Sequence, residues 1–235
     1  MCRERTPVTT QPDIPANRYG RYCVPAGLED RPAARAVLAG QAYEPETLRF
    51  MRAHAGDGDI IHAGAFFGDF IPALSTALTP GARLWAFEPN PGNFASAQET
   101  VRLNDLQNVT LTNAAVSNQP DELLFRTRDK DGKSLGGLSH FVTEPGDGVE
   151  AVAAAMLDFV VPLDRKVSIL QLDVEGHEKQ AMLGAYHLVN RWAPILILEY
   201  FNKPQWIARR FPGLGYRHIG KLHGNHVFAA RDITL

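Results

Sequence analysis

A short apolar segment that breaks into a glycine turn constrains this chain more than any other feature. Residues 59–63 read Asp-Ile-Ile-His-Ala, the turn carries Gly64 and Gly68, and residues 70–78 have the apolar spacing of a helix packed on a sheet. Glycine tolerates positive φ and lets a ligand approach the backbone, while the start of the next helix offers free N–H groups. The segment predicts a strand, a turn and a helix of the nucleotide-binding kind, although the turn alone is not specific.

The alternation of apolar strands and helices continues along the chain. Further strands are expected at residues 83–88, 109–113, 167–173 and 194–200, and helices at 33–54, 91–104 and 178–191. Two more strands surround a turn at His223 and Gly224, residues 149–161 fit either a strand or a helix, and residues 118–148 are irregular enough to carry function or short strands of their own. This order predicts an α/β fold with a doubly wound, mostly parallel sheet of about seven strands.

Length and proline content suggest how the chain is divided. With 235 residues, of which 45% are hydrophobic, it is long enough for one full-sized core and short for two. Five prolines precede residue 33, so we predict an irregular N-terminal arm over residues 1–32 and one domain over residues 33–235. Cys2 and Cys23 both fall in the arm, and no disulfide framework or metal quartet is expected from them.

The net charge of −2 provides no bulk attraction to nucleic acid or to an anionic membrane. No apolar run approaches the roughly 20 residues that span a bilayer, and the N-terminus lacks the apolar core of a signal peptide. These features favour a cytoplasmic protein with a small-molecule partner. The sequence leaves open whether it is a monomer or a homo-oligomer.

Polar residues and the glycine turn follow the predicted strands at what would be one edge of the sheet. They are Gly64, Glu88, Asn113, Asp173 and Glu199. Glu88, which is 24 positions beyond Gly64, is placed to accept hydrogen bonds from the two ribose hydroxyls of a nucleoside. Phe66 and Phe67 in the turn leave little room for a pyrophosphate. The edge therefore favours a nucleoside cofactor without phosphates.

The motifs at these strand ends resemble, in their order, those of the FkbM family of S-adenosylmethionine-dependent methyltransferases. They are Gly64-Ala65-Phe66-Phe67-Gly68, Ala86-Phe87-Glu88-Pro89-Asn90-Pro91, Asn113-Ala114-Ala115-Val116-Ser117, Asp173-Val174-Glu175-Gly176-His177-Glu178 and Ile197-Leu198-Glu199. The resemblance covers roughly residues 57–200. It implies a Rossmann-like class I methyltransferase fold, S-adenosylmethionine as cofactor, and O-methylation of a hydroxyl on a sugar, a polyketide or another small metabolite in natural product biosynthesis.

The resemblance also implies a role for each matching residue. The methionine part of the cofactor would be bordered by Gly64, Ala65 and Gly68, and the ribose by Glu88, Pro89 and Asn90. The adenine would lie beside Asn113, Ala114 and Ala115, and the reactive methyl would lie near Asp173. Two positions depart from the family pattern. His62, which we also count as a cofactor contact, stands where Asp is usual, and Gln171 stands where Lys is common. The chain thus lacks a carboxylate for the turn or the cofactor amine, and a cation that could orient the substrate.

Methyl transfer of this kind is a direct displacement, in which the acceptor oxygen attacks the sulfonium methyl in line. Positioning contributes most of the catalysis, about 7–11 kcal/mol in favourable cases, and a general base takes the hydroxyl proton. The predicted catalytic residues are Asp173, Glu175 and His140. His177 and Glu199 are further candidates, and together with the two carboxylates they have donor atoms that suit Mg²⁺ or Mn²⁺. Because neighbouring residues point in different directions, no metal is predicted.

Two other functions fit parts of the pattern. A nicotinamide-dependent dehydrogenase would use the same strand, turn and helix followed by an acidic residue, but the phenylalanines in the turn and the absence of a Tyr-x-x-x-Lys pair argue against it. A scaffold that binds S-adenosylmethionine without catalysis is suggested by His62 and Gln171. Binding of the cofactor and transfer of its methyl group distinguish these functions.

Overall fold

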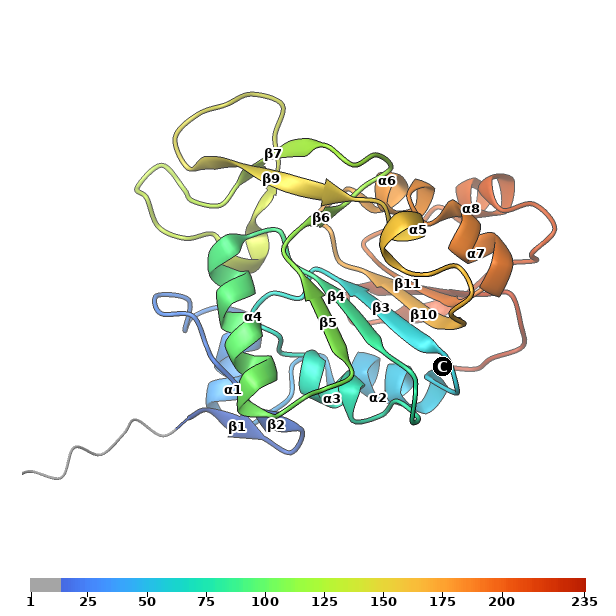
Figure 1. The fold of residues 1–235 in the computed structure, drawn as a ribbon, viewed down its shortest axis with the longest axis horizontal. Helices are drawn as coiled ribbons and strands as arrows, with labels where there is room; N and C mark the ends of the chain where they lie inside the picture. The colour runs from blue at the N-terminus through green and yellow to red at the C-terminus, as the bar shows by residue number, and fades with distance from the viewer. Residues whose placement is uncertain (1–13) are drawn as a thin grey trace, which may run out of the picture.

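A computed structural model describes residues 14–235 and contains a central sheet of seven strands (Figure 1). In spatial order the strands are β12 (Arg217–Leu222), β13 (Asn225–Ala229), β11 (Ile195–Glu199), β10 (Val167–Leu172), β3 (Asp59–Ala63), β4 (Leu84–Phe87) and β5 (Val109–Thr112). The five strands from β11 to β5 are parallel, while β13 and β12 continue the sheet in antiparallel pairing. The predicted doubly wound, mostly parallel sheet is confirmed.

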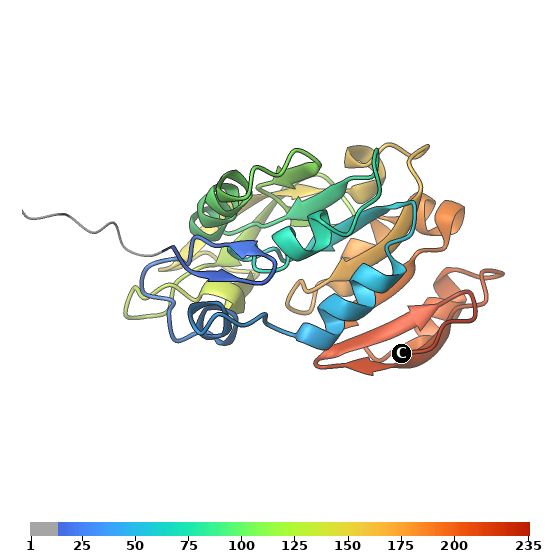
Figure 2. The same ribbon diagram turned by 90° about the horizontal axis from the view of Figure 1, so that it is seen from below.

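Helices cover both faces of this sheet. One face carries α2 (Pro45–His54), α3 (Ile71–Ser75) and α4 (Pro91–Leu103), and the other carries α5 (Leu157–Val160), α6 (Glu178–Leu183), α7 (Tyr186–Trp192) and α8 (Pro204–Arg210). Figure 2 looks at the sheet from the side of α2 and α3. Because both faces are covered, β3, β4 and β10 are buried along their whole length, which explains their nearly continuous apolar sequences. None of the helices within residues 14–235 has the length and apolar character needed to cross a membrane.

Two of the predicted helices are each divided in the structure. The expected helix at residues 33–54 is α1 (Pro32–Leu38) followed by α2, and Gly40 between them has a φ of 72°. The expected helix at residues 178–191 is α6 followed by α7, with Gly184 at the break. A Cβ atom on Gly184 would lie 1.9 Å from the carbonyl oxygen of Ser117, so the chain approaches this point too closely for a larger residue. The prediction of one helix at residues 178–191 was wrong, whereas the start of α2 at Pro45 agrees with the Glu-Pro-Glu sequence of residues 44–46, which suits a helix start.

A smaller sheet of four strands lies over the carboxyl ends of the central strands (Figure 1). Its order is β6 (Ala115–Val116), β9 (Val149–Ala155), β7 (Glu122–Arg126) and β8 (His140–Phe141), and a 3₁₀ turn, η1 (Gly136–Leu138), precedes β8. The irregular stretch at residues 118–148 therefore does carry short strands. The ambiguous residues 149–161 form a strand followed by the short helix α5. The small sheet encloses the space at the strand ends from above.

The described part of the N-terminal arm is a strap packed on the core. Its two-residue strands β1 (Ala16–Asn17) and β2 (Gly20–Arg21) form a hairpin, and Tyr22 is fully buried against α1 and the ring of Phe67. The backbone N–H of Arg21 donates to Asn104 Oδ1 at 2.8 Å, and that of Cys23 donates to Thr100 Oγ1 at 3.0 Å. Residues 1–13, including Cys2, lie outside the described residues. The division at residue 32 stays a prediction.

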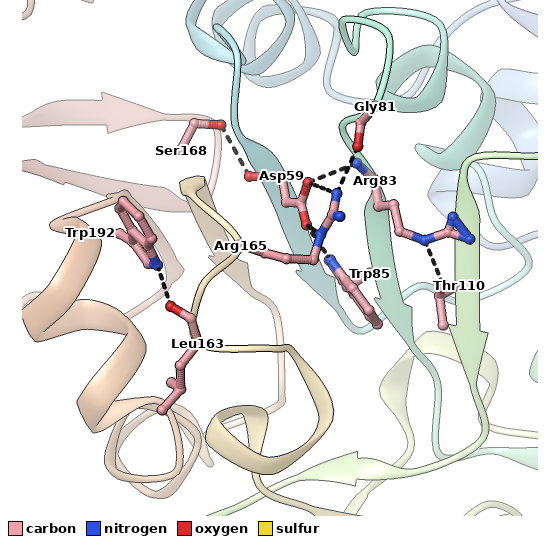
Figure 3. A network of polar contacts seen from close by, with 9 residues as sticks. All are labelled: Asp59, Gly81, Arg83, Trp85, Thr110, Leu163, Arg165, Ser168 and Trp192. Carbon is pink, nitrogen blue, oxygen red and sulfur yellow. Dashed lines mark hydrogen bonds and ion pairs between the residues drawn. The ribbon is translucent and has the colours of Figure 1, made fainter.

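The amino end of β3 is held by a polar network around Asp59 (Figure 3). Its buried carboxylate accepts hydrogen bonds from the backbone N–H of Arg83 at 2.8 Å and from Trp85 Nε1 at 2.7 Å. The guanidinium of Arg165 also donates to both carboxylate oxygens, at 2.5 and 2.8 Å. One side chain thus joins β3 to β4 and to the loop before β10, at the edge of the sheet opposite to the carboxyl ends.

Candidate active site

A cavity of about 480 Å³ lies at the carboxyl ends of β4, β3, β10 and β11. Its walls come from the turn after β3, from the small sheet and from the loop before α2, and its size is in the range of small-molecule sites. Most of the predicted cofactor residues line it, namely His62, Gly64, Glu88, Pro89, Ala114, Ala115 and Asp173. The remaining predicted residues do not line it, namely Ala65, Gly68, Asn90 and Asn113. The predicted convergence of the strand ends is present in the fold.

Gly64 begins the turn after β3 and lies against Asp173, which directly follows β10. Its φ is 90°, and a Cβ atom on it would lie 2.0 Å from the carbonyl oxygen of Asp173, which only glycine avoids. The backbone N–H groups of Gly64 and Ala65 both donate to the carbonyl oxygen of Phe87 at 3.0 Å. Gly68, with a φ of 84°, packs closely against Thr100 of α4. Ala65 and Gly68 therefore shape the turn, whereas Gly64 also faces the cavity.

Glu88 fastens the turn to the end of β4. One carboxylate oxygen, Oε2, accepts a hydrogen bond from the backbone N–H of Phe66 at 2.8 Å, and Oε1 accepts one from that of Asn90 at 2.9 Å. Burial raises the pKa of Glu88 to about 7, and these two hydrogen bonds act in the opposite direction. Each carboxylate oxygen accepts two hydrogen bonds, and Oε1 receives its second from Asn93 Nδ2 at 3.4 Å. Glu88 thus holds its own loops and keeps acceptor capacity on Oε2 toward the cavity that it lines.

Two asparagines support the loop after Glu88. Asn90 caps α4, because its Oδ1 accepts from the backbone N–H groups of Gly92 at 2.9 Å and Asn93 at 3.2 Å, and its Nδ2 donates to Ser139 Oγ at 3.1 Å. The exposed Asn113 donates through Nδ2 to the carbonyl oxygen of Glu88 at 2.8 Å. Neither asparagine lines the cavity. Their contacts position Glu88 and join the central sheet to the loop before β8.

Three carboxylates gather at the β10 and β11 end of the cavity. One oxygen from each of Asp173, Glu175 and Glu199 lies within 4.8 Å of the others. Burial and the neighbouring Glu199 raise the pKa of Asp173 well above its ordinary value. Desolvation at the cavity rim and the same neighbour raise the pKa of Glu175, which is exposed, to about 7. Like charges this close disfavour the ionisation of all three groups at once, unless a cation lies among them. The group could hold a proton or a divalent cation.

The two histidines considered in the sequence lie outside this group. His177 Nε2 is 3.0 Å from Ser117 Oγ, and the imidazole packs on the ring of Phe141 with 4.1 Å between centroids. His140 is exposed, and its Nδ1 is 3.0 Å from the carbonyl oxygen of Leu138. His140 is not among the residues that line the cavity. The roles assigned to His140, Glu175 and Asp173 in catalysis stay predictions.

The comparison with known protein families identifies the family of this chain. The model of the methyltransferase FkbM domain matches residues 62–217. The chain belongs to the FkbM methyltransferase family. This match spans the glycine turn, Glu88 and the three carboxylates of the cavity, and it does not support the dehydrogenase alternative. No protein with curated annotation matches the chain.

One solved methyltransferase structure shares the fold of this FkbM domain, and others match it with lower TM-scores. A methyltransferase FkbM from Methylobacillus flagellatus is 16% identical, with a TM-score of 0.52, and the match covers 74% of this chain and 43% of that one. A methyltransferase from Geobacter sulfurreducens is 11% identical, with a TM-score of 0.45 and coverage of 80% and 78%. A SAM-dependent methyltransferase from Aquifex aeolicus is 11% identical, with a TM-score of 0.42 and coverage of 80% and 89%. The chain spans less than half of the Methylobacillus protein.

The FkbM cavity also contains residues that the sequence analysis did not select. Asp69 follows the glycine turn, Tyr43 and Glu44 precede α2, and Leu138 and Tyr200 line the cavity with side chains that are 54% and 77% exposed. A carboxylate directly after Gly68 was a usable signal for Asp69. Glu44 gave no such signal, because its Glu-Pro-Glu context is also typical of a helix start, and its carboxylate is brought to the cavity by a 2.7 Å hydrogen bond from Asn225 of β13.

The buried carboxyl group of Asp69 makes the stability of the FkbM domain depend on pH. Burial, with a smaller contribution from Glu44, raises its pKa from 3.8 to about 7. The folded state therefore binds this proton more tightly than the unfolded state, and the stabilisation is complete below the unfolded pKa and lost as the pH rises through about 7. A shift of one pKa unit between the folded and unfolded states corresponds to about 1.4 kcal/mol of stability. The amide in the Asp69→Asn variant avoids the burial of a charge but still loses part of its hydration. We expect Asp69→Asn to stabilise the ligand-free protein by about 2–3 kcal/mol at pH 8.

Guanidinium unfolding at two pH values checks this expectation. The gain from Asp69→Asn should shrink toward zero as the pH falls through 4, because the carboxyl group is already protonated in the folded wild type and becomes protonated in the unfolded state at its ordinary pKa of 3.8. The exposed Asp30 supplies the matched control, and Asp30→Asn should change the unfolding free energy little at either pH. An Asp69→Asn gain that is equal at pH 4 and pH 8 would contradict the role of burial.

Proposed function

We propose that this chain transfers the methyl group of S-adenosylmethionine to a hydroxyl of a small metabolite, such as a sugar or a polyketide. The observation that carries the proposal is the buried Glu88 carboxylate, which is fastened to the glycine turn and lines a cavity of about 480 Å³. A carboxylate in this position suits the two ribose hydroxyls of a nucleoside. The close backbone approach at Gly64 suits a ligand that lies along the turn. The residues present therefore fit the cofactor.

Bound S-adenosylmethionine supplies a methyl group on a sulfonium, and the chain supplies orientation and a base. Pro89, Ala114 and Ala115 give the cavity an apolar wall beside Glu88, which suits an adenine ring. The acceptor would enter from the rim, where Glu175 lies and where Leu138 and Tyr200 are exposed. A general base works best with a pKa near the working pH, and Glu175 has a pKa of about 7. Glu175 is accordingly the base that fits a hydroxyl acceptor best.

Binding and turnover test the proposal in sequence. Titration calorimetry with S-adenosylhomocysteine should show one site per chain, and no binding up to about millimolar would refute the cofactor. Transfer of a labelled methyl group to panels of glycosides, polyketide alcohols and amines then tests catalysis. Binding without transfer to any hydroxyl or amine in such panels would favour the scaffold function. Transfer only to amines would show that the acceptor group is an amine and not a hydroxyl.

Glu88 offers the sharpest single-residue test of the cofactor. We expect Glu88→Ala to weaken the binding of S-adenosylhomocysteine by about 1.5–3 kcal/mol, because charge-assisted hydrogen bonds to the ribose would be lost. Glu88→Gln keeps the size of the side chain and one carbonyl acceptor, so it separates lost charge from lost volume. Calorimetry with 2′-deoxyadenosine and adenosine gives the control, since the mutation should matter most for the ligand with both hydroxyls. Unchanged affinity in Glu88→Ala would rule out the ribose role.

A further inference from the structure

The cavity is lined by many more carboxylates than cations. Arg31 is the one Lys or Arg among its described lining residues, and its guanidinium donates to the carbonyl oxygen of Ser134 at 3.5 Å. The six acidic residues of the lining are Glu44, Asp69, Glu88, Asp173, Glu175 and Glu199. None of them forms an ion pair within residues 14–235. A cavity with such an excess of negative charge attracts positively charged ligands.

Glu44 lies beside the carboxylates at the ends of β10 and β11. In the sheet register Asn225 of β13 is paired with Glu199 of β11, and Asn225 Nδ2 donates to Glu44 Oε2 at 2.7 Å. An oxygen of Glu199 also lies within 4.8 Å of one from Asp173 and one from Glu175. Asn225 thus brings a carboxylate from the loop before α2 to those of the strand ends. We call Glu44, Asp173 and Glu199 the acidic wall.

Asp69 adds an unpartnered carboxylate to the same cavity. It lines the cavity and is 9% exposed, and apart from its own backbone N–H no group within residues 14–235 donates to it. Neither of its carboxylate oxygens is among the described atoms that lack both solvent contact and a partner, so an oxygen without a partner is accessible. A buried charge is costly unless a partner neutralises it. A cation bound in the cavity would be such a partner.

The cofactor alone leaves most of this negative charge without a partner. S-adenosylmethionine carries a sulfonium and an ammonium, but its own carboxylate cancels one of these positive charges. The sulfonium charge is then lost when the methyl group leaves. Asp69 and the acidic wall therefore stay in excess after the cofactor has bound, and a positively charged second substrate would balance them.

We propose that the hydroxyl acceptor carries a protonated amine, as an amino sugar does, and that Asp69 and the acidic wall hold this ammonium group. The inference rests on the proposed function and narrows its acceptor. A protonated amine has no lone pair, so the nitrogen does not take the methyl group. The hydroxyl oxygen forms the bond to the methyl carbon as the carbon–sulfur bond breaks, and the hydroxyl proton passes to Glu175. An acceptor with a phosphate or carboxylate group is repelled.

A divalent cation is the competing partner for these carboxylates. Among the described residues, the group with oxygens within 4.8 Å of one another consists of Asp173, Glu175 and Glu199. Glu44 and Asp69 lie outside this group, so an ion held by it would leave both without a partner. An ammonium group on a larger acceptor, with three N–H donors, can be shared between the wall and Asp69.

Three sugars that differ only at carbon 6 test the inference. They are 6-amino-6-deoxyglucose, glucose and glucose 6-phosphate, and calorimetry at pH 7.5 with EDTA measures their binding to the protein saturated with S-adenosylhomocysteine. The amino sugar should bind at least about tenfold more tightly than glucose, and the phosphate more weakly than glucose. Equal affinities, preference for the phosphate, or no binding of the amino sugar up to about 100 mM would overturn the inference. Loss of the preference for the amine when Mg²⁺ replaces EDTA would also overturn it.

Variants of two carboxylates show whether they hold the acceptor or the cofactor. Glu44→Gln and Asp69→Asn should each reduce the preference for the amino sugar over glucose about threefold to tenfold, because each removes a charge that faces the ammonium. Binding of S-adenosylhomocysteine should change less than about twofold. Glu46→Gln is the matched control, because Glu46 is an exposed carboxylate in the first turn of α2, and it should change neither quantity.

The outcomes separate this inference from the proposed function. Weaker binding of S-adenosylhomocysteine in Glu44→Gln or Asp69→Asn would assign these carboxylates to the cofactor and overturn the inference. A labelled methyl group found on the nitrogen of an amino sugar would overturn it as well. A wild type that binds no S-adenosylhomocysteine would overturn the proposed function, on which the inference rests.

Discussion

Replacing Gly64 with alanine is expected to lower the free energy of unfolding by about 3–5 kcal/mol and to abolish measurable binding of S-adenosylhomocysteine. The φ of 90° is unfavourable for any residue with a Cβ atom, and it accounts for about 1–2 kcal/mol. The remainder comes from crowding, because the new Cβ atom would lie 2.0 Å from the carbonyl oxygen of Asp173. Relief of this overlap requires β3 and β10 to separate at the cavity.

Gly81 provides a matched control for this substitution. Its φ is 91°, nearly the same as that of Gly64, but no atom lies within 4 Å of a Cβ built on it. Gly81→Ala should therefore lose only the conformational part, about 1–2 kcal/mol, and should bind ligand normally. Guanidinium unfolding followed by tryptophan fluorescence measures both variants. Equal losses in the two variants would show that β10 does not approach the turn as closely as the structure has it.

The parts of the fold that were predictable depend on local patterns. The strand ends at Gly64, Glu88 and Asp173 could be placed because an apolar run, a turn residue and a polar group follow one another in the sequence. Parallel strands then bring such ends to one edge, wherever they occur in the chain. The break between α6 and α7 was not predictable in this way. At this break Gly184 packs closely against Ser117, which is distant in the sequence.

The same distinction between local patterns and distant contacts applies to the residues of the candidate site. Residues on the strand ends and the glycine turn were found, because their position follows from the sheet order. Asp69 and Glu44 were missed because they reach the cavity through the packing of the turn and of α2. The pairing of His62 with Gln171 was also missed, since it requires the register between β3 and β10. The sequence shows His62 and Gln171 only as two separate departures from the family pattern, whereas the structure shows that they are in contact.

Asp59 lies at the amino end of β3, opposite to Gly64. Asp59→Ala is expected to lower the free energy of unfolding by about 3–5 kcal/mol. Its carboxylate lies with 3% of the side chain exposed, whereas the side chain of its partner Arg165 is 31% exposed. Removal of the carboxylate would leave the indole N–H of Trp85 and the backbone N–H of Arg83 without their acceptor. Unsatisfied buried donors add to the loss of the ion pair.

The adjacent ion pair of Asp57 with Lys166 shows why burial should decide the outcome. Both side chains are exposed, so Asp57→Ala should change the unfolding free energy by less than about 1 kcal/mol. Equal effects of Asp57→Ala and Asp59→Ala in guanidinium unfolding would refute the importance of the buried network. Asp59→Asn keeps one acceptor and should retain more stability than Asp59→Ala. Because Asp59 lies at the amino end of β3, folded Asp59→Asn should bind S-adenosylhomocysteine as the wild type does, in contrast to Gly64→Ala at the carboxyl end.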